Sequence, residues 1–139
     1  MSAFLWALLT ACIWGVVPLM EKIGLGSASP TTGVVVRSLG VVVGLVVMTL
    51  IASPWGAIRS LSWPAILLLA GGGLLASFVG QMAFYRALKS GALSQVTPVA
   101  GAYPLVAALL GWSVLREPLT VSRLLGVGCV VVGVILLRK

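Results

Sequence analysis

The sequence predicts an all-α membrane protein with five transmembrane helices. Apolar stretches of roughly 20 residues, the length that crosses the hydrocarbon core as a helix, follow one another along the chain. Of its 139 residues, 60% are hydrophobic and 8% are charged, and the mean hydropathy is +1.21. Five spans of this length leave no room for a soluble domain. We therefore expect a single transmembrane domain over residues 1–139.

Charged pairs and Gly, Ser and Pro clusters mark the span ends. The first span ends before Glu21 and Lys22, which a Gly- and Ser-rich joint follows. The second ends at Pro54, and Trp63 and Pro64 start the third, because proline suits a first helical turn. The expected spans are residues 4–20, 31–53, 63–88, 92–115 and 119–137.

Composition excludes several classes of site. The chain has no histidine, and its two acids are both glutamates, so no metal cluster, cofactor site or His-based catalysis is expected. Cys12 and Cys129 lie inside apolar runs and suggest no disulfide framework. The net charge of +7 sits mostly at span ends, where it favours lipid headgroups rather than nucleic acid. We expect no enzyme activity.

The loop charges bear on orientation. An odd number of spans places the termini on opposite sides of the membrane. The Lys and Arg tally leans moderately towards an outer N-terminus and an inner C-terminus. One side carries Arg59, Arg116 and Arg123, and the other carries Lys22, Arg86, Lys89, Arg138 and Lys139.

Two charged residues beside the first joint are candidate cavity residues. Glu21 falls seven residues after Trp14, so both share one helix face, and an acid on a cavity face would couple proton movement to transport. The alternative is that Glu21 meets water at the helix end or pairs with Lys22. Lys22 is either a charge at the cavity mouth or an ordinary interfacial lysine.

Arg37 lies about 9 Å into the second span if that helix starts near Thr31. A guanidinium at that depth is costly unless it meets a carboxylate, a carbonyl or a watery cavity, and Glu21 is a candidate partner. The alternative is snorkelling to the headgroups.

Polar residues line one face of the third span. Gly73, Ser77, Gln81 and Tyr85 recur every four residues, which predicts an inward-facing stripe. The Gln81 amide and Tyr85 hydroxyl could bind substrate, or the stripe could join helices through hydrogen bonds.

The fourth span carries two prolines. Pro98 and Pro104 each free a backbone carbonyl about one turn earlier, which predicts a broken segment or a static kink. Gln95 and Tyr103 add polar groups on this span.

The last span offers a contact surface. Gly126 and Gly133 are one heptad apart and would let another helix approach closely, so they are candidate dimer-interface residues. Glu117 is expected to cap the start of this helix.

The order of several motifs resembles the EamA-like repeat of the drug/metabolite transporter superfamily. The motifs are Trp14-Gly15, Lys22, Arg37, Phe84–Leu88, Pro104, Leu115–Thr120, and Gly126 with Gly133. Family members commonly have two such five-helix repeats, so this chain looks like one half of an inverted-repeat transporter. The resemblance implies a cavity lined by the first, third and fourth helices. It also implies a partner, which is either a second copy in the antiparallel orientation or a sister half-chain.

Three functions fit this sequence. The first is a secondary transporter that moves a small organic metabolite or drug by alternating access as a dimer, in a bacterial or archaeal plasma membrane. The second is a subunit of a lipid-carrier flippase that moves polyprenyl-linked sugars. The third is a membrane assembly protein that transports nothing, in which the polar stripes only join helices.

Overall fold

The computed structural model describes residues 3–118 and 120–137, and every regular element within them is helical. The contacts divide the chain into two compact units, Met1–Ser90 and Gly91–Lys139, and each is described by itself. The single transmembrane domain stays a prediction. Leu119, Arg138 and Lys139, which the sequence assigns to the last span and its charged end, lie outside the described residues.

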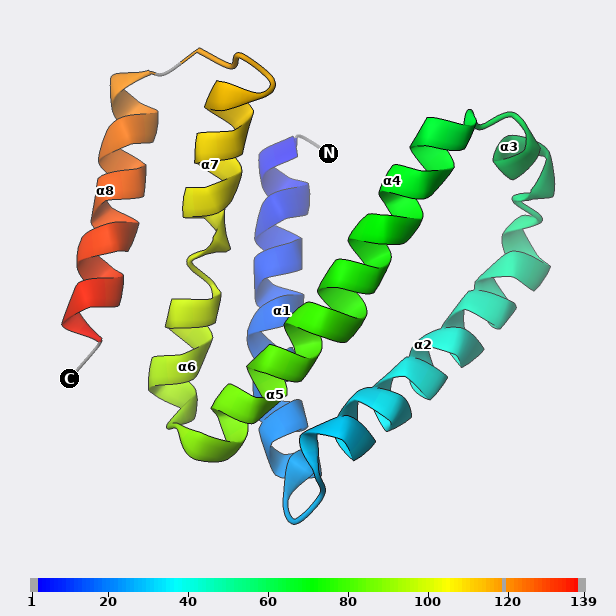
Figure 1. The fold of residues 1–139 in the computed structure, drawn as a ribbon, viewed down its shortest axis with the longest axis horizontal. Helices are drawn as coiled ribbons and strands as arrows, with labels where there is room; N and C mark the ends of the chain where they lie inside the picture. Colours follow the sequence, from blue (N-terminus) through cyan, green and yellow to red (C-terminus); the bar gives the residue numbers. More distant parts are fainter. Residues whose placement is uncertain (1–2, 119, 138–139) are drawn as a thin grey trace. The chain divides into compact units, whose positions relative to one another are not determined.

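The first unit contains three apolar helical stretches (Figure 1). Phe4–Leu25, Pro30–Ala52 and Trp63–Ser90 are each long and apolar enough to cross a membrane. The elements are α1 (Ala3–Leu25), α2 (Pro30–Ala52), α3 (Trp55–Arg59), α4 (Trp63–Leu74), the π-helical segment η1 (Leu75–Gly80) and α5 (Gln81–Ser90).

The first helix is longer than expected. We expected it to end near Met20, but α1 continues through Glu21 and Lys22 to Leu25. Gly26 follows with a positive φ of 37°, a left-handed conformation that glycine adopts easily at a helix end. Glu21 therefore belongs to the helix and not to the joint.

Local signals explain where α2 and α4 begin. The Ser29 hydroxyl accepts a hydrogen bond from the Thr32 backbone N–H, 3.1 Å away, and Pro30 occupies the first turn. Ser62 accepts from the Ala65 N–H in the same way, at 3.4 Å. These serine caps satisfy backbone donors that the first helical turn leaves unpaired.

A π-helical segment interrupts the third stretch. A π-helical turn holds more residues than an α-helical turn, so η1 changes the number of residues per turn within this stretch. The stripe from Gly73 to Tyr85 stays a prediction. Gln81 and Tyr85 still share a face because both lie in α5.

The second unit contains α6 (Leu93–Ala100), α7 (Tyr103–Ser113) and α8 (Val121–Leu136). The fourth expected span is broken between Ala100 and Tyr103, and Pro104 lies in the first turn of α7. Leu93–Ser113 is still long and apolar enough to cross a membrane. The fifth expected span contains only the 16-residue α8, shorter than the other four stretches.

The cap expected for α8 is wrong. Thr120, not Glu117, is its N-cap, and the Thr120 hydroxyl accepts from the Arg123 N–H at 3.4 Å. Glu117 instead folds over Gly111, where a Cβ would lie 3.4 Å from the carboxyl carbon. Its Oε2 lies 3.5 Å from Nη1 of Arg123.

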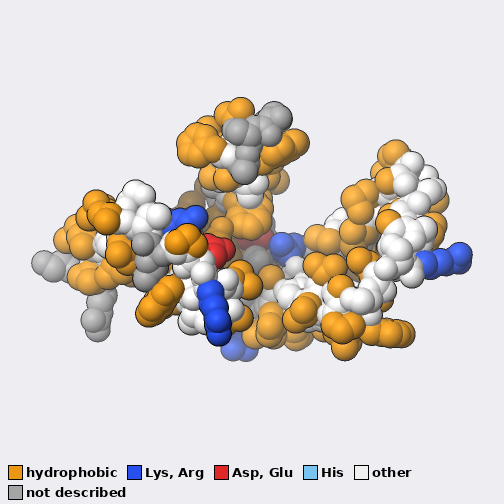
Figure 2. Space-filling view, turned by 90° about the horizontal axis from the view of Figure 1, so that it is seen from above, with side chains coloured by type: hydrophobic (Ala, Val, Ile, Leu, Met, Phe, Trp, Pro, Cys, Tyr) orange, Lys and Arg blue, Asp and Glu red, His pale blue; other side chains and the backbone are white. Residues whose placement is uncertain are grey.

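Most of the hydrophobic side chains are exposed. Hydrophobic atoms dominate the face shown in Figure 2, as expected of helices surrounded by acyl chains. The buried hydrophobic residues are few and lie in the first unit: Leu25, Val34, Tyr85 and Leu88. They come from α2, α5 and the end of α1, which are in mutual contact.

Gly33 permits this close packing. A Cβ at Gly33 would lie 2.6 Å from Leu25 Cδ2 and 2.8 Å from Tyr85 Cε2, both well inside van der Waals contact. Gly40 and Gly44 of the same helix would meet nothing within 4 Å. Among the α2 glycines, Gly33 is therefore the one that the packing requires.

We predict that Gly33→Ala destabilises the protein by about 1–3 kcal/mol, because the Tyr85 ring must move. Gly40→Ala is the matched control, and it should be neutral or slightly stabilising because alanine favours the helix. Thermal unfolding in detergent, followed by tryptophan fluorescence, measures both. Equal midpoints for the two variants would contradict the packing role of Gly33.

We predict that Gly133→Leu splits a dimer without unfolding the chain. A Cβ at Gly126 or Gly133 would meet nothing within 4 Å, so leucine fits the single chain but would keep a partner helix away. Crosslinking and mass measurement in detergent test this, with Gly44→Leu on α2 as the control. A dimer that persists in Gly133→Leu places the interface elsewhere.

Candidate functional site

One carboxylate joins three helices in the first unit. Oε1 of Glu21, on α1, accepts hydrogen bonds from the Gln81 amide and the Tyr85 hydroxyl, each 2.9 Å away. The same oxygen lies 3.2 Å from Nε of Arg37, on α2. Gln81 and Tyr85 both belong to α5, one turn apart. We call Glu21, Arg37, Gln81 and Tyr85 the polar cluster.

The members of the polar cluster differ in exposure. The Glu21 side chain is 11% exposed and Tyr85 is buried, whereas the Arg37 side chain is 32% exposed. A carboxylate at this depth is stable only when charge and hydrogen bonds replace its lost hydration. One cation and two neutral donors supply that replacement.

Arg37 forms the ion pair that the sequence offered as one of its alternatives. It lies seven residues after Pro30, roughly 10 Å along α2 at 1.5 Å per residue. Its pairing is incomplete, because the buried Nη1 nitrogen has no hydrogen-bond partner among the described residues.

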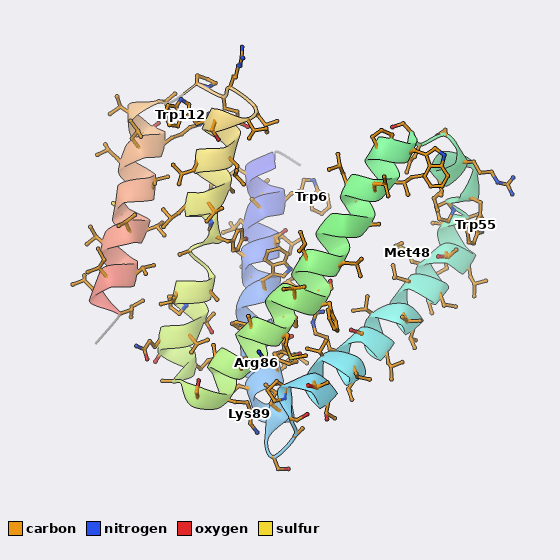
Figure 3. The ribbon with its side chains drawn as sticks, viewed as in Figure 1. Trp6, Met48, Trp55, Arg86, Lys89 and Trp112 are labelled. Carbon is orange, nitrogen blue, oxygen red and sulfur yellow. The ribbon has the colours of Figure 1, made fainter. Side chains whose placement is uncertain are left out.

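Two lysines tie the same helix ends together. Lys22, in the last turn of α1, donates to the Leu88 carbonyl of α5. Lys89, in the last turn of α5, donates to the Gly26 and Ala28 carbonyls that follow α1, at 3.0 and 2.9 Å. Figure 3 shows Lys89 at this end of α5. Lys22 therefore meets the end of α5, and Lys89 meets the residues just after α1. Carbonyls at helix ends lack partners within the helix and attract cations.

The remaining candidate cavity residues are Trp14 in the first unit and Gln95, Tyr103 and Pro104 in the second. Trp14 is on α1 and exposed. In the second unit, Gln95 donates to the Leu137 carbonyl at 2.9 Å, which ties α6 to the end of α8. Tyr103 is exposed, and Pro104 follows it in the first turn of α7.

The second unit contains a small hollow between α7 and α8. Its volume is about 180 Å³, and its lining is mostly apolar, with Leu109, Trp112 and Leu124 among its walls. Glu117 and Arg123 also line it, and their side chains are 54% and 56% exposed.

Sequence reasoning missed two residues that shape the cluster. Gly33 lies four residues before Arg37 and therefore on the same face of α2. A glycine at this position could have indicated that another helix comes close to that face. Lys89 was counted only as an anchor at a span end. Nothing in its sequence context pointed to the carbonyls of another helix.

Chemically, the cluster is suited to binding. It combines a carboxylate, a guanidinium, an amide and a phenol within apolar helices, and these groups recognise polar parts of a small molecule. Such charged residues inside membrane helices mark substrate or ion pathways.

Comparison with known proteins identifies the family. The model of the EamA-like transporter family matches residues 1–139. An uncharacterized transporter in the cobO 3' region from Sinorhizobium sp. is 26% identical over 132 residues, covering 95% of this chain and 93% of the relative. No solved structure matches. The chain belongs to the EamA-like transporter family, and it is a multi-pass membrane transporter rather than an enzyme.

Proposed function

We propose that the protein moves a small organic metabolite or drug across the membrane by alternating access, acting as a dimer of five-helix halves. The observation that carries this proposal is the polar cluster. It brings an acid and an arginine together inside helices that are otherwise apolar.

The energetics favour a functional cluster. An arginine inside a membrane helix costs up to about 2.5–3.5 kcal/mol on insertion scales, with the largest cost at the helix centre, and burying an ion pair rarely repays its desolvation. Helix association alone needs no charges, because small residues such as Gly33 already allow close contact. A charge pair kept at such a cost supports a role in binding.

The arrangement of contacts in the first unit supports movement as well. The end where α1, α2 and α5 meet is held by the polar cluster and the two lysine bonds. These hydrogen bonds and the ion pair are polar contacts that can break and form again, and they lie beside the buried apolar side chains of the same end. A transporter that exposes its site alternately to the two sides needs contacts that break and form again.

The glycines of α8 support the dimer. Gly126 and Gly133 present open space on a membrane helix, and such small-residue positions are typical helix contact sites. The family resemblance adds that a complete transporter contains two five-helix halves. A second copy of this chain, with the opposite orientation, would supply the other half.

We predict that Arg37→Ala and Tyr85→Phe each lower transport about tenfold or more, because each removes a hydrogen bond to a charged group, worth about 1.5–3 kcal/mol. Metabolites whose levels differ between cells with and without the protein are identified by mass spectrometry. Their accumulation is then compared among the variants.

Two controls accompany this measurement. Arg59→Ala removes an exposed arginine from α3 and should leave transport unchanged. Membrane insertion of every variant is checked by its abundance in the membrane fraction. Full transport by inserted Arg37→Ala and Tyr85→Phe would show that the polar cluster only joins helices.

We predict that an antiparallel homodimer inserts in both orientations. Ser27 and Ser60 are exposed and lie beyond opposite ends of α2, so Ser27→Cys and Ser60→Cys report on opposite membrane sides. Cys12 and Cys129 are first replaced. An impermeant thiol reagent should label both new cysteines from each side.

One-sided labelling gives the opposite answer. If an outside reagent labels only one of the two positions, and an inside reagent only the other, the chain has a single orientation. The antiparallel homodimer would then be wrong, and a sister half-chain of opposite orientation would be needed.

A further inference from the structure

The bonding of Arg37 is unfinished. A guanidinium offers five N–H donors, yet the described residues receive only the Nε bond to Glu21. The Nη1 nitrogen is buried and without a partner there. A buried donor left unpaired costs about 1–3 kcal/mol, and more on a charged group. An acceptor that reached Nη1 would recover this free energy.

Glu21 does not complete the pairing. Arginine and a carboxylate often form two parallel bonds, but here all three donors converge on Oε1. Gln81 and Tyr85 hold that oxygen from α5 and so fix where the carboxylate lies. Glu21 therefore orients Arg37 through Nε and leaves Nη1 to another acceptor.

The charge around the polar cluster favours an anion. Glu21 is the single acid of the first unit in the sequence. The three contacting helices bring four cations to the same end: Lys22 on α1, Arg37 on α2, and Arg86 and Lys89 on α5. A cationic substrate would meet repulsion and would have to displace Arg37 from Glu21. An anionic substrate would be attracted by these cations and could accept a hydrogen bond from the unpaired Nη1 of Arg37.

We propose that the transported molecule carries a carboxylate and that the Arg37 guanidinium binds it through Nη1. This inference rests on the transport function proposed above. Glu21 is then a positioning residue, because it acts through Arg37. Nη1 is buried in this structure, so binding requires the helices around it to separate, as alternating access entails.

Matched compounds test the charge class directly. The probes are three sets, each with one carbon skeleton and three end groups: 4-methylpentanoate, 4-methylpentylamine and 4-methylpentanol; phenylacetate, phenethylamine and 2-phenylethanol; succinate, putrescine and 1,4-butanediol. Thermal stabilisation of the purified full chain is followed through its five tryptophans. Ligands that bind only the folded protein raise the unfolding midpoint.

We expect at least one carboxylate to stabilise the protein more than its amine and alcohol partners. Arg37→Gln should weaken the apparent affinity about tenfold or more, as loss of a charge-assisted bond implies. Arg59→Gln is the control, because it removes an exposed arginine of α3 that lies outside this set of cations, and it should change affinity less than about twofold. Arg37→Lys keeps the positive charge but loses the paired N–H donors of the guanidinium. It should therefore weaken the affinity by an intermediate amount, which can be measured even if Arg37→Gln does not fold.

The opposing outcomes separate the two proposals. Stabilisation by amines or alcohols but not by carboxylates overturns the anion inference and leaves transport standing. Carboxylate binding that survives Arg37→Gln and Arg37→Lys overturns it too. If no compound of any class stabilises the protein, the carboxylate inference is overturned, whereas the transport function is decided by the accumulation measurement described above.

Discussion

The requirement to compensate one carboxylate within apolar helices organises the first unit. Glu21 lies in α1, and its compensation comes from α2 and α5, so satisfying its charge fixes the three helices side by side. Removing one partner would leave the other charge buried and unpaired, which costs more than the pair contributes. The cluster thus constrains how the three helices pack, and a ligand that bound there could change that packing.

The contacts of this unit are concentrated at one end. Leu25, Tyr85 and Leu88 are buried there, Gly33 allows their close approach, and the two lysines bond across the ends of α1 and α5. Away from this end, the helices are largely exposed to their surroundings. Stability that is concentrated in one polar, hydrogen-bonded region can be lost and regained locally, without unfolding the helices.

Much of the fold follows from apolar length, whereas the exceptions follow from contacts between elements. Hydrophobic runs and serine or proline signals predict four of the five stretches well. The extension of α1 to Leu25 depends on partners for Glu21 and Lys22 that lie about 60 residues away. Nothing in the sequence distinguished the π-helical segment from an ordinary α-helix. Nothing distinguished Thr120 from Glu117 as the cap of α8 either. Pairing of Arg37 with Glu21 could be named from the sequence, because few acids were available; its single-bonded geometry could not.

The two acids of the chain form ion pairs that differ in their exposure. Glu117 and Arg123 form an ion pair at 3.5 Å with both side chains more than half exposed, and such pairs contribute about 0–1 kcal/mol. Glu21 and Arg37 form the same kind of pair at 3.2 Å, with the carboxylate 11% exposed and held by two further donors. Solvent or salt easily replaces the partners of the exposed pair. In the Glu21–Arg37 pair the carboxylate is shielded from such replacement, whereas the Arg37 side chain is 32% exposed. The carboxylate selectivity proposed above therefore rests on Glu21 and Arg37, where a mismatched charge is penalised more than at the exposed pair.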